Sequence, residues 1–191
     1  MGKKMKWFKF DIRNLSDDEY LMYYSTLSSD RLEKIDSLKN NKDKKLSLAG
    51  EILAKKAVSE ILSLNKEELQ IKNLPDGKPY LENISLNLSI SHSGDFAVCA
   101  VSKKPVGIDI QLKRDISLEV AKKFCNQDEL NYINSSNTKN EQQNRFYEIW
   151  TAKEAGFKCG IAKSFKNINT LALNKEYHDF ENYKVCIVKG K

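Results

Sequence analysis

Charged side chains interrupt an apolar stretch near the end of the chain. Residues 149–158 have a helical pattern and carry Lys153, Glu154 and Lys158 among bulky residues. Glu154 and Lys158 stand four residues apart, so on a helix their side chains lie on the same side. Such a pair is either an ordinary surface ion pair, or a carboxylate and an ammonium group that serve one small site together.

The same stretch predicts a helix face that packs on a core. At about 100° per residue, Phe146, Trp150 and Phe157 project within roughly 40° of one another. We therefore expect a helix over residues 145–160 with this apolar stripe buried. Lys153 falls inside the stripe, where a cation is out of place in a purely structural helix.

A second group of oxygen-bearing side chains lies on a predicted strand over residues 106–111. Asp109 and Gln111 share one face of this strand, and Ile108 and Ile110 share the other. Carboxylate and amide oxygens at this spacing suit Mg²⁺, which takes one or two carboxylates and completes its shell with water and substrate phosphate. Asp109 and Gln111 are therefore candidate metal ligands.

A third candidate site is a strand end that combines imidazole and hydroxyl groups. Apolar and polar residues alternate over residues 84–90, which predicts a strand with one buried face. His92 continues the apolar face and is flanked by Ser91 and Ser93. It is either a structural histidine or part of a small anion site, and the neighbouring hydroxyl groups favour the anion site.

Turn chemistry and periodicity predict the remaining elements. A Pro-Asp-Gly turn followed by a second proline places Lys78 on a stiff loop. Residues 30–45 are dense in charge, as is typical of a solvated face. We expect strands at residues 7–12 and 96–101, helices from Ser16 onwards and over 46–62 and 118–133, and pairing of residues 165–173 with 183–188.

Two short segments occur twice, in the same helix-then-strand order. Residues 54–57 resemble residues 152–155, and residues 98–101 resemble residues 185–188. This echo is either chance in a lysine-rich chain or a duplication that produced two α+β halves, joined near residues 105–118. In a duplicated chain, the acidic strand and the charged helix meet where the halves join, which is a favoured place for a ligand.

Composition bounds the class of protein. The 191 residues are 40% hydrophobic, enough for a folded core, and 32 basic against 26 acidic residues give a net charge of +6. We therefore expect an anionic partner: a phosphate, a nucleotide, an acidic protein or nucleic acid. The four cysteines are widely spaced, which argues against a zinc site or disulfide framework. No signal peptide or membrane-length apolar run is apparent, so we expect a cytoplasmic protein that contacts no membrane.

Four motifs occur in order along the chain: Gly77-Lys78-Pro79, Ser89-Ile90-Ser91-His92-Ser93-Gly94, Gly107-Ile108-Asp109-Ile110, and Trp150-Thr151-Ala152-Lys153-Glu154-Ala155-Gly156-Phe157-Lys158. Together they resemble those of the 4′-phosphopantetheinyl transferases of the surfactin-synthetase-activating type. The resemblance implies a monomer with an α+β fold, in which two similar α/β halves over residues 1–110 and 111–191 form a pseudo-two-fold arrangement. The active site is then expected where the halves meet.

The resemblance also implies a reaction. Coenzyme A would donate 4′-phosphopantetheine to a serine of an acidic apo carrier protein, acyl or peptidyl, and adenosine 3′,5′-bisphosphate would be released. Mg²⁺, or Mn²⁺ in its place, would bind the pyrophosphate through Asp109 and Glu154. Gln111 stands where many relatives have glutamate, and it is expected to bind the metal weakly or through water.

The implied catalytic residues are Asp109, Glu154 and Lys158, with Lys158 beside the reacting phosphate. Lys153 is expected to extend towards the same phosphates or towards the join of the halves. The nucleotide end of coenzyme A would contact the first half of the chain. The residues expected to hold coenzyme A are Arg31, Lys34, Ser47, Lys78, Ser91, His92, Lys153 and Lys158.

Two other functions fit parts of the sequence. The charged run over residues 31–45 suits a nucleic-acid-binding protein without catalytic activity, but it lacks interleaved aromatic residues. Asp109 and Glu154 also suit another Mg²⁺-dependent phosphotransferase, although the chain has no GxxxxGK[ST] loop. We therefore favour the transferase, with no nucleic-acid partner.

Overall fold

The computed structural model describes residues 5–65, 69–74, 77–82 and 84–191. The chain divides into two compact units, Met1–Lys103 and Lys104–Lys191, so the predicted boundary after residue 110 is too late. The acidic strand consequently belongs to the second unit. Pro75 and Asp76 of the predicted turn lie outside the described residues. The predicted pseudo-two-fold arrangement stays a prediction.

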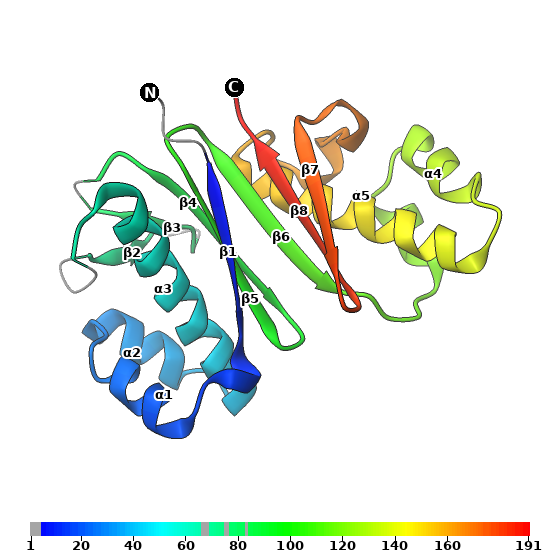
Figure 1. Ribbon diagram of the computed structural model, residues 1–191. Helices are drawn as coiled ribbons and strands as arrows, with labels where there is room; N and C mark the ends of the chain where they lie inside the picture. The colour runs from blue at the N-terminus through cyan, green and yellow to red at the C-terminus, as the bar shows by residue number, and fades with distance from the viewer. Residues whose placement is uncertain (1–4, 66–68, 75–76, 83) are drawn as a thin grey trace. The chain divides into compact units, whose positions relative to one another are not determined.

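The first unit packs a long helix on a three-stranded antiparallel sheet (Figure 1). The strand order is β1-β5-β4, and the long helix α3 contacts all three strands. A separate two-stranded sheet pairs β2 with β3. The elements are β1 (Lys6–Asp11), α1 (Asp17–Tyr24), α2 (Ser29–Asp36), α3 (Asn41–Leu62), β2 (Ile71–Asn73), β3 (Pro79–Leu81), β4 (Asn87–Ser93) and β5 (Phe96–Ser102).

Local signals explain where the first helices begin and how they pack. Ser16 and Glu19 form the predicted capping box, in which the Ser16 hydroxyl accepts from the Glu19 amide at 3.2 Å. The predicted stripe of α3 is buried against the sheet. The charged run over residues 30–45 is not wholly a solvated face, because α2 buries Arg31 and Ile35.

The second unit has the same arrangement, a long helix on a three-stranded antiparallel sheet (Figure 1). Its strand order is β6-β8-β7, and α5 contacts β6 and β8. No helix within the described ranges is both long and apolar enough to cross a bilayer. The elements are β6 (Val106–Leu112), the 3₁₀ helix η3 (Leu118–Lys123), α4 (Gln127–Asn134), α5 (Lys139–Cys159), the 3₁₀ helices η4 (Phe165–Asn167) and η5 (Thr170–Ala172), β7 (Lys175–Phe180) and β8 (Tyr183–Lys189).

The two units therefore repeat one topology, as the echo in the sequence indicates. In each, an edge strand leads through helices to a hairpin, and the last strand of the hairpin lies in the centre of the sheet. Residues 54–57 and 152–155 lie on α3 and α5. Residues 98–101 and 185–188 lie on the central strands β5 and β8. The fold is α+β with two similar halves.

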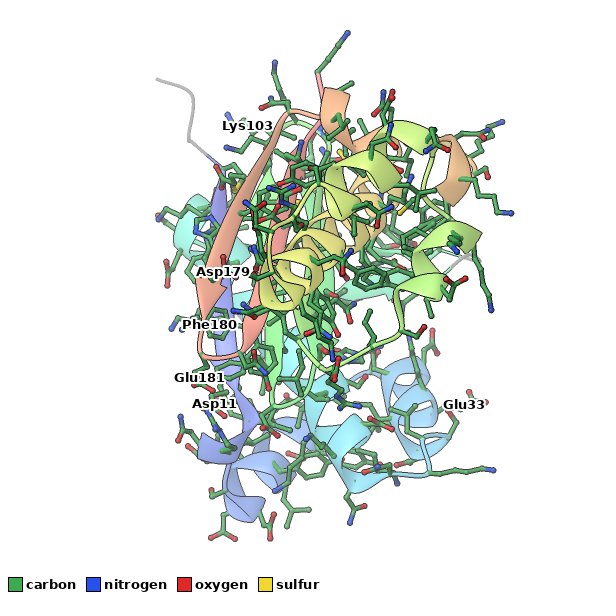
Figure 2. All side chains as sticks on the ribbon, turned by 90° about the vertical axis from the view of Figure 1, so that its right-hand side faces the viewer. Asp11, Glu33, Lys103, Asp179, Phe180 and Glu181 are labelled. Atoms are coloured by element: carbon green, nitrogen blue, oxygen red, sulfur yellow. The ribbon has the colours of Figure 1, made fainter. Side chains whose placement is uncertain are left out.

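Two predicted elements of the second unit are wrong. Residues 118–133 form the short helix η3 and then α4, because Asn126 caps a new helix through the Glu129 amide. Residues 165–173 form η4 and η5 rather than a strand. The partner of β8 is the charged strand β7, and the hairpin turns at Glu181, whose φ is 47° (Figure 2). The sequence pattern did not indicate a strand at β7, because this strand lies at the edge of the sheet and carries charged residues.

The apolar stripe of α5 is buried over only part of its length. Trp150 packs edge-on against Phe124 and Phe165, with ring centroids 4.7 Å and 5.6 Å apart, and it stacks on Phe146. Phe157, two turns further along, is 48% exposed, so its predicted burial is wrong. Periodicity identifies a face of a helix, but it does not tell how far a covering element extends.

A glycine sets the separation of α5 from β6. A Cβ atom on Gly107 would overlap the carbonyl oxygen of Ala155 and lie 2.6 Å from the amide nitrogen of Cys159. The backbones of the strand and the helix are therefore in direct contact. Asp109 and Gln111 follow Gly107 on the same face of β6, because side chains alternate along a strand.

We expect Gly107→Ala to lower the free energy of unfolding by about 3 kcal/mol, because the new methyl group meets main-chain atoms that cannot turn away. Urea denaturation measures the change. Gly156→Ala is the matched control, since its Cβ would meet only side-chain atoms, the nearest on Ile168 at 3.2 Å. The control should change stability by less than about 1 kcal/mol. Equal unfolding midpoints for Gly107→Ala and the unsubstituted protein would contradict the direct contact.

Candidate active site

The first unit contains a cavity of about 480 Å³ between α2, α3, the β2–β3 sheet and β4. It brings together four predicted coenzyme-binding positions, Arg31, Lys34, Ser47 and His92, from three different elements. Gly77 and Pro79, on either side of Lys78, also line it. Its other lining residues are Leu38, Asp43, Leu46, Glu51, Ile71, Asn73 and Ile90.

Arg31 is held in place by a buried carboxylate of α3. Its Nε atom donates to Glu51 Oε2 at 2.7 Å, and its Nη2 atom lies 3.4 Å from the Ser47 hydroxyl oxygen. Glu51 also pairs with Lys55, whose Nζ lies 3.3 Å from Oε1. Because Arg31 and Glu51 are both nearly fully buried, this pairing fixes the guanidinium at the cavity wall.

The cavity wall is suited to an anion. Burial lowers the pKa of Lys34, and the neighbouring Arg31 guanidinium lowers it further. A negative group placed between two cations offsets their mutual repulsion. Lys34 and Arg31 therefore present two positive charges to the cavity, with apolar walls at Leu46 and Ile90 beside them.

Ser91 is not part of this cavity. His92 and Ile90 line it from one face of β4, and Ser91 belongs to the opposite face because side chains alternate along a strand. Ser91 and His92 are therefore neighbours in the sequence motif, but their side chains lie on opposite faces of β4. The role of Ser91 in holding the coenzyme stays a prediction.

The second unit places the predicted catalytic residues together. Lys158 Nζ lies 2.7 Å from Asp109 Oδ1, and Gln111 Nε2 donates to Asp109 Oδ2 at 3.0 Å. Asp109 is 2% exposed, so this carboxylate is desolvated and depends on these partners. The end of the Lys158 side chain, from α5, thus contacts the carboxylate of Asp109, from β6.

Glu154 completes this cluster. Burial raises the pKa of Glu154, the nearby Asp109 carboxylate raises it further, and the Lys158 ammonium opposes both effects. Two carboxylates therefore share one ammonium group. The arrangement leaves the cluster short of positive charge, as is common where a cation or a proton takes part in function.

The donor set fits a hard divalent cation. Among the described residues, no group of three or more histidine, cysteine or acidic side chains is arranged to hold a metal. Asp109 and Glu154 nevertheless supply two carboxylates, and the side-chain amide of Gln111 lies beside Asp109, with its nitrogen turned to that carboxylate. Mg²⁺ is commonly held by one or two carboxylates, with its other positions taken by water and substrate phosphate. The crowding of the two carboxylates is the observation that favours a cation here.

Lys153 does not belong to this cluster, and its predicted contact with the coenzyme phosphates is wrong. Its side chain is fully buried, with Nζ 3.0 Å from Glu129 Oε2 and 2.6 Å from the Ile168 carbonyl oxygen. Glu129 is equally buried. The charge of Lys153 is thus neutralised inside the second unit, where it does not reach a phosphate.

Two buried carboxylates escaped sequence reasoning, although both have a sequence signal. Glu51 lies on the polar face of α3, one turn after Ser47 and one turn before Lys55, which is the spacing of a helix ion pair. Glu129 follows Asn126 at capping-box spacing and fills that role in the structure. Burial opposes ionisation of Glu129, but the amides of Thr170 and Asn126 hold its pKa below the usual range.

Comparison with known proteins covers most of the chain. Residues 14–104 match the family model for the N-terminal part of 4′-phosphopantetheinyl transferases, and residues 105–185 match the model for the 4′-phosphopantetheinyl transferase superfamily. A holo-(acyl-carrier-protein) synthase from Bacillus anthracis superposes on 51% of this chain and 91% of its own, with a TM-score of 0.43 and 23% identity.

Two curated relatives are similar over most of this chain. The 4′-phosphopantetheinyl transferase Sfp of Bacillus subtilis strain 168 is 32% identical over 76% of this chain and 65% of its own length. The transferase gsp of Aneurinibacillus migulanus is 31% identical over 84% of this chain and 67% of its own. The chain thus spans about two thirds of the length of these relatives. It belongs to the 4′-phosphopantetheinyl transferase superfamily.

Proposed function

We propose that this protein is a Mg²⁺-dependent transferase that moves 4′-phosphopantetheine from coenzyme A to a serine of an apo acyl or peptidyl carrier protein. Adenosine 3′,5′-bisphosphate is the second product. The observation that carries the proposal is the cluster of Asp109, Glu154 and Lys158 in a chain that belongs to this superfamily. The predicted monomeric state and cytoplasmic location stay predictions.

The cavity of the first unit is proposed to hold the nucleotide end of coenzyme A. Arg31, fixed by Glu51, and Lys34 present positive charge to phosphate groups. His92 offers a further polar contact at the end of β4, and Lys78 lies between two lining residues. The apolar walls suit a planar base, because ligand sites combine such walls with a few fixed polar groups.

The cluster of the second unit is proposed to hold the pyrophosphate and to carry the chemistry. Asp109 and Glu154 would hold Mg²⁺ or Mn²⁺, with Gln111 as a weak or water-mediated ligand, and the ion supplies positive charge to the pyrophosphate. Lys158 contacts Asp109 in this structure. The Lys158 ammonium would contact a phosphate oxygen and donate a proton to the leaving group.

Glu154 is the candidate acceptor for the serine proton. The hydroxyl oxygen of the carrier serine forms the new bond to the β-phosphorus, the bond from that phosphorus to the leaving phosphate breaks, and the serine proton moves to a Glu154 oxygen. The raised pKa of Glu154 makes its carboxylate a stronger base. Metal binding weakens that basicity, so the phosphate oxygens share the role.

An acidic carrier protein fits the charge of this chain. The net charge of +6 favours encounter with an anionic protein surface. The nucleic-acid alternative is not favoured, because three cations of the 31–45 run are paired within the molecule. These pairs are Arg31 with Glu51, Lys42 with Asp95, and Lys45 with Asp17.

The activity is tested directly by mass measurement. We expect incubation with coenzyme A, Mg²⁺ and a panel of apo acyl and peptidyl carrier proteins to add one phosphopantetheine to at least one carrier. A carrier in which the acceptor serine is replaced by alanine is the control and should remain unmodified. Absence of an adduct on every carrier of the panel would refute the proposed function.

Replacement of Glu154 tests the cluster. We expect Glu154→Gln to lower kcat at least about 100-fold at saturating Mg²⁺, because it removes both a carboxylate ligand and the proton acceptor. The measurement is the initial rate of carrier modification. Glu141→Gln, in the first turn of the same helix, is the matched control and should keep kcat. Near-normal transfer by Glu154→Gln would remove Glu154 from the mechanism.

Replacement of Lys34 tests the cavity. We expect Lys34→Gln to raise the KM for coenzyme A about tenfold with little change in kcat, because a phosphate contact stabilises ground state and transition state alike. Lys34 is a cleaner choice than Arg31, whose removal strands the buried Glu51 carboxylate. Lys39→Gln, an exposed change outside the cavity lining, is the control. If both variants have the same KM, the cavity does not hold the coenzyme.

A further inference from the structure

Lys153 and Glu129 form a buried polar joint beside the catalytic cluster. Both side chains have no solvent exposure, and three separate segments meet at the joint. Lys153 comes from α5 and donates to the Ile168 carbonyl oxygen at 2.6 Å. Glu129 comes from α4 and accepts from both the amide and the hydroxyl of Thr170, at 3.0 Å and 2.7 Å.

The joint is not explained by stability alone. The attraction within a buried ion pair offsets little more than the free-energy cost of desolvating its two charges. Apolar residues of similar volume often give an equally stable protein. What distinguishes this pair is its geometry, because each of its contacts has a defined length and direction. Such a joint fixes a position more narrowly than apolar packing does.

The surroundings of α5 show which position is fixed. At about 100° per residue, Lys153 and Gly156 lie on one side of the helix, where Gly156 faces Ile168. Ala155 lies on a second side, in contact with β6 at Gly107. The third side carries Glu154 and Lys158, which is the side of Asp109. The helix is therefore held on two sides, and the third carries the site.

We infer that Lys153 and Glu129 are positioning residues, which fix the rotation of the last turns of α5 so that Glu154 and Lys158 meet Asp109. Neither residue touches the substrate. Rotation of the helix by a fraction of a turn would move Glu154 and Lys158 together, because they share one side. The catalytic part of this inference rests on the proposed function, whereas the structural part does not.

The test compares variants that retain the fold. Lys153→Met leaves a buried carboxylate without its cation, and it should destabilise the protein strongly. Adding Glu129→Gln removes the uncompensated charge and retains an acceptor for Thr170, but it takes the second acceptor oxygen from the Asn126 amide, so the double variant should regain part of the lost melting temperature. Arg145→Met is the matched control. Arg145 also ties α5 to α4, through the Tyr132 carbonyl oxygen at 2.6 Å, but at the far end from the cluster.

Three measurements follow. We expect the double variant to lose about 10- to 100-fold in kcat, the size that a misplacement of about 1 Å produces. Its affinity for adenosine 3′,5′-bisphosphate, measured by calorimetry, should stay within about twofold, because the first unit is unchanged. Amide hydrogen exchange, followed by mass spectrometry, should accelerate over residues 152–159 in the double variant but not in Arg145→Met.

Each outcome decides the inference. A double variant with restored stability and unchanged kcat and exchange would show that the pair serves stability alone. An equal loss of kcat in Arg145→Met would show that any tie between α4 and α5 suffices. If the double variant does not fold, Glu129→Gln alone is judged by the same measurements. If the unsubstituted protein transfers nothing, the proposed function fails, and the exchange measurement still decides the positioning role.

Discussion

Direct contact between the backbones of β6 and α5 is the constraint on which the second unit depends. Side chains normally separate a helix from a sheet, and at Gly107 that separation is absent. Asp109, two residues further along the same face, has a short side chain that would not span a wider gap. The close approach at Gly107 therefore brings α5 near the Asp109 carboxylate, whose Oδ1 lies 2.7 Å from Lys158 Nζ.

Buried cations have two different uses in this chain. Arg31 is nearly fully buried, but its carboxylate partner leaves the guanidinium at a cavity wall, where a phosphate can reach it. Lys153 is fully buried, and its ammonium group is enclosed by Glu129 and a carbonyl oxygen. A buried charge without partners is strongly destabilising, so both need carboxylates. The surroundings of the charged group, rather than the residue type, decide whether a buried cation is available to a ligand or only links elements of the fold.

The sequence could predict what depends on local periodicity. The two-residue repeat of a strand placed Asp109 and Gln111 on one face, and the four-residue spacing of a helix placed Glu154 beside Lys158. Periodicity could not predict what depends on neighbours distant in sequence. Lys153 lies in an apolar stripe because Glu129 meets it there, and Phe157 is exposed because no described element covers the end of that stripe.

The duplicated topology shows why the fold alone does not make the site. Asp109 pairs across the sheet with Cys186, and the echo equates Cys186 with Cys99, whose partner on the edge strand is Phe8. Phe8 packs against the core of the first unit. The echo likewise places Lys56 at the position of Glu154.

The first unit therefore has the strand and the helix of the second without its carboxylates. Where the second unit buries an acid against its long helix, the first has a partly buried aromatic ring, and several of its charged residues line the cavity at Arg31. One topology thus carries a cavity lined by Arg31 and Lys34 in one unit and a carboxylate cluster in the other. The difference lies in a few side chains at equivalent positions, so function has to be argued from those side chains.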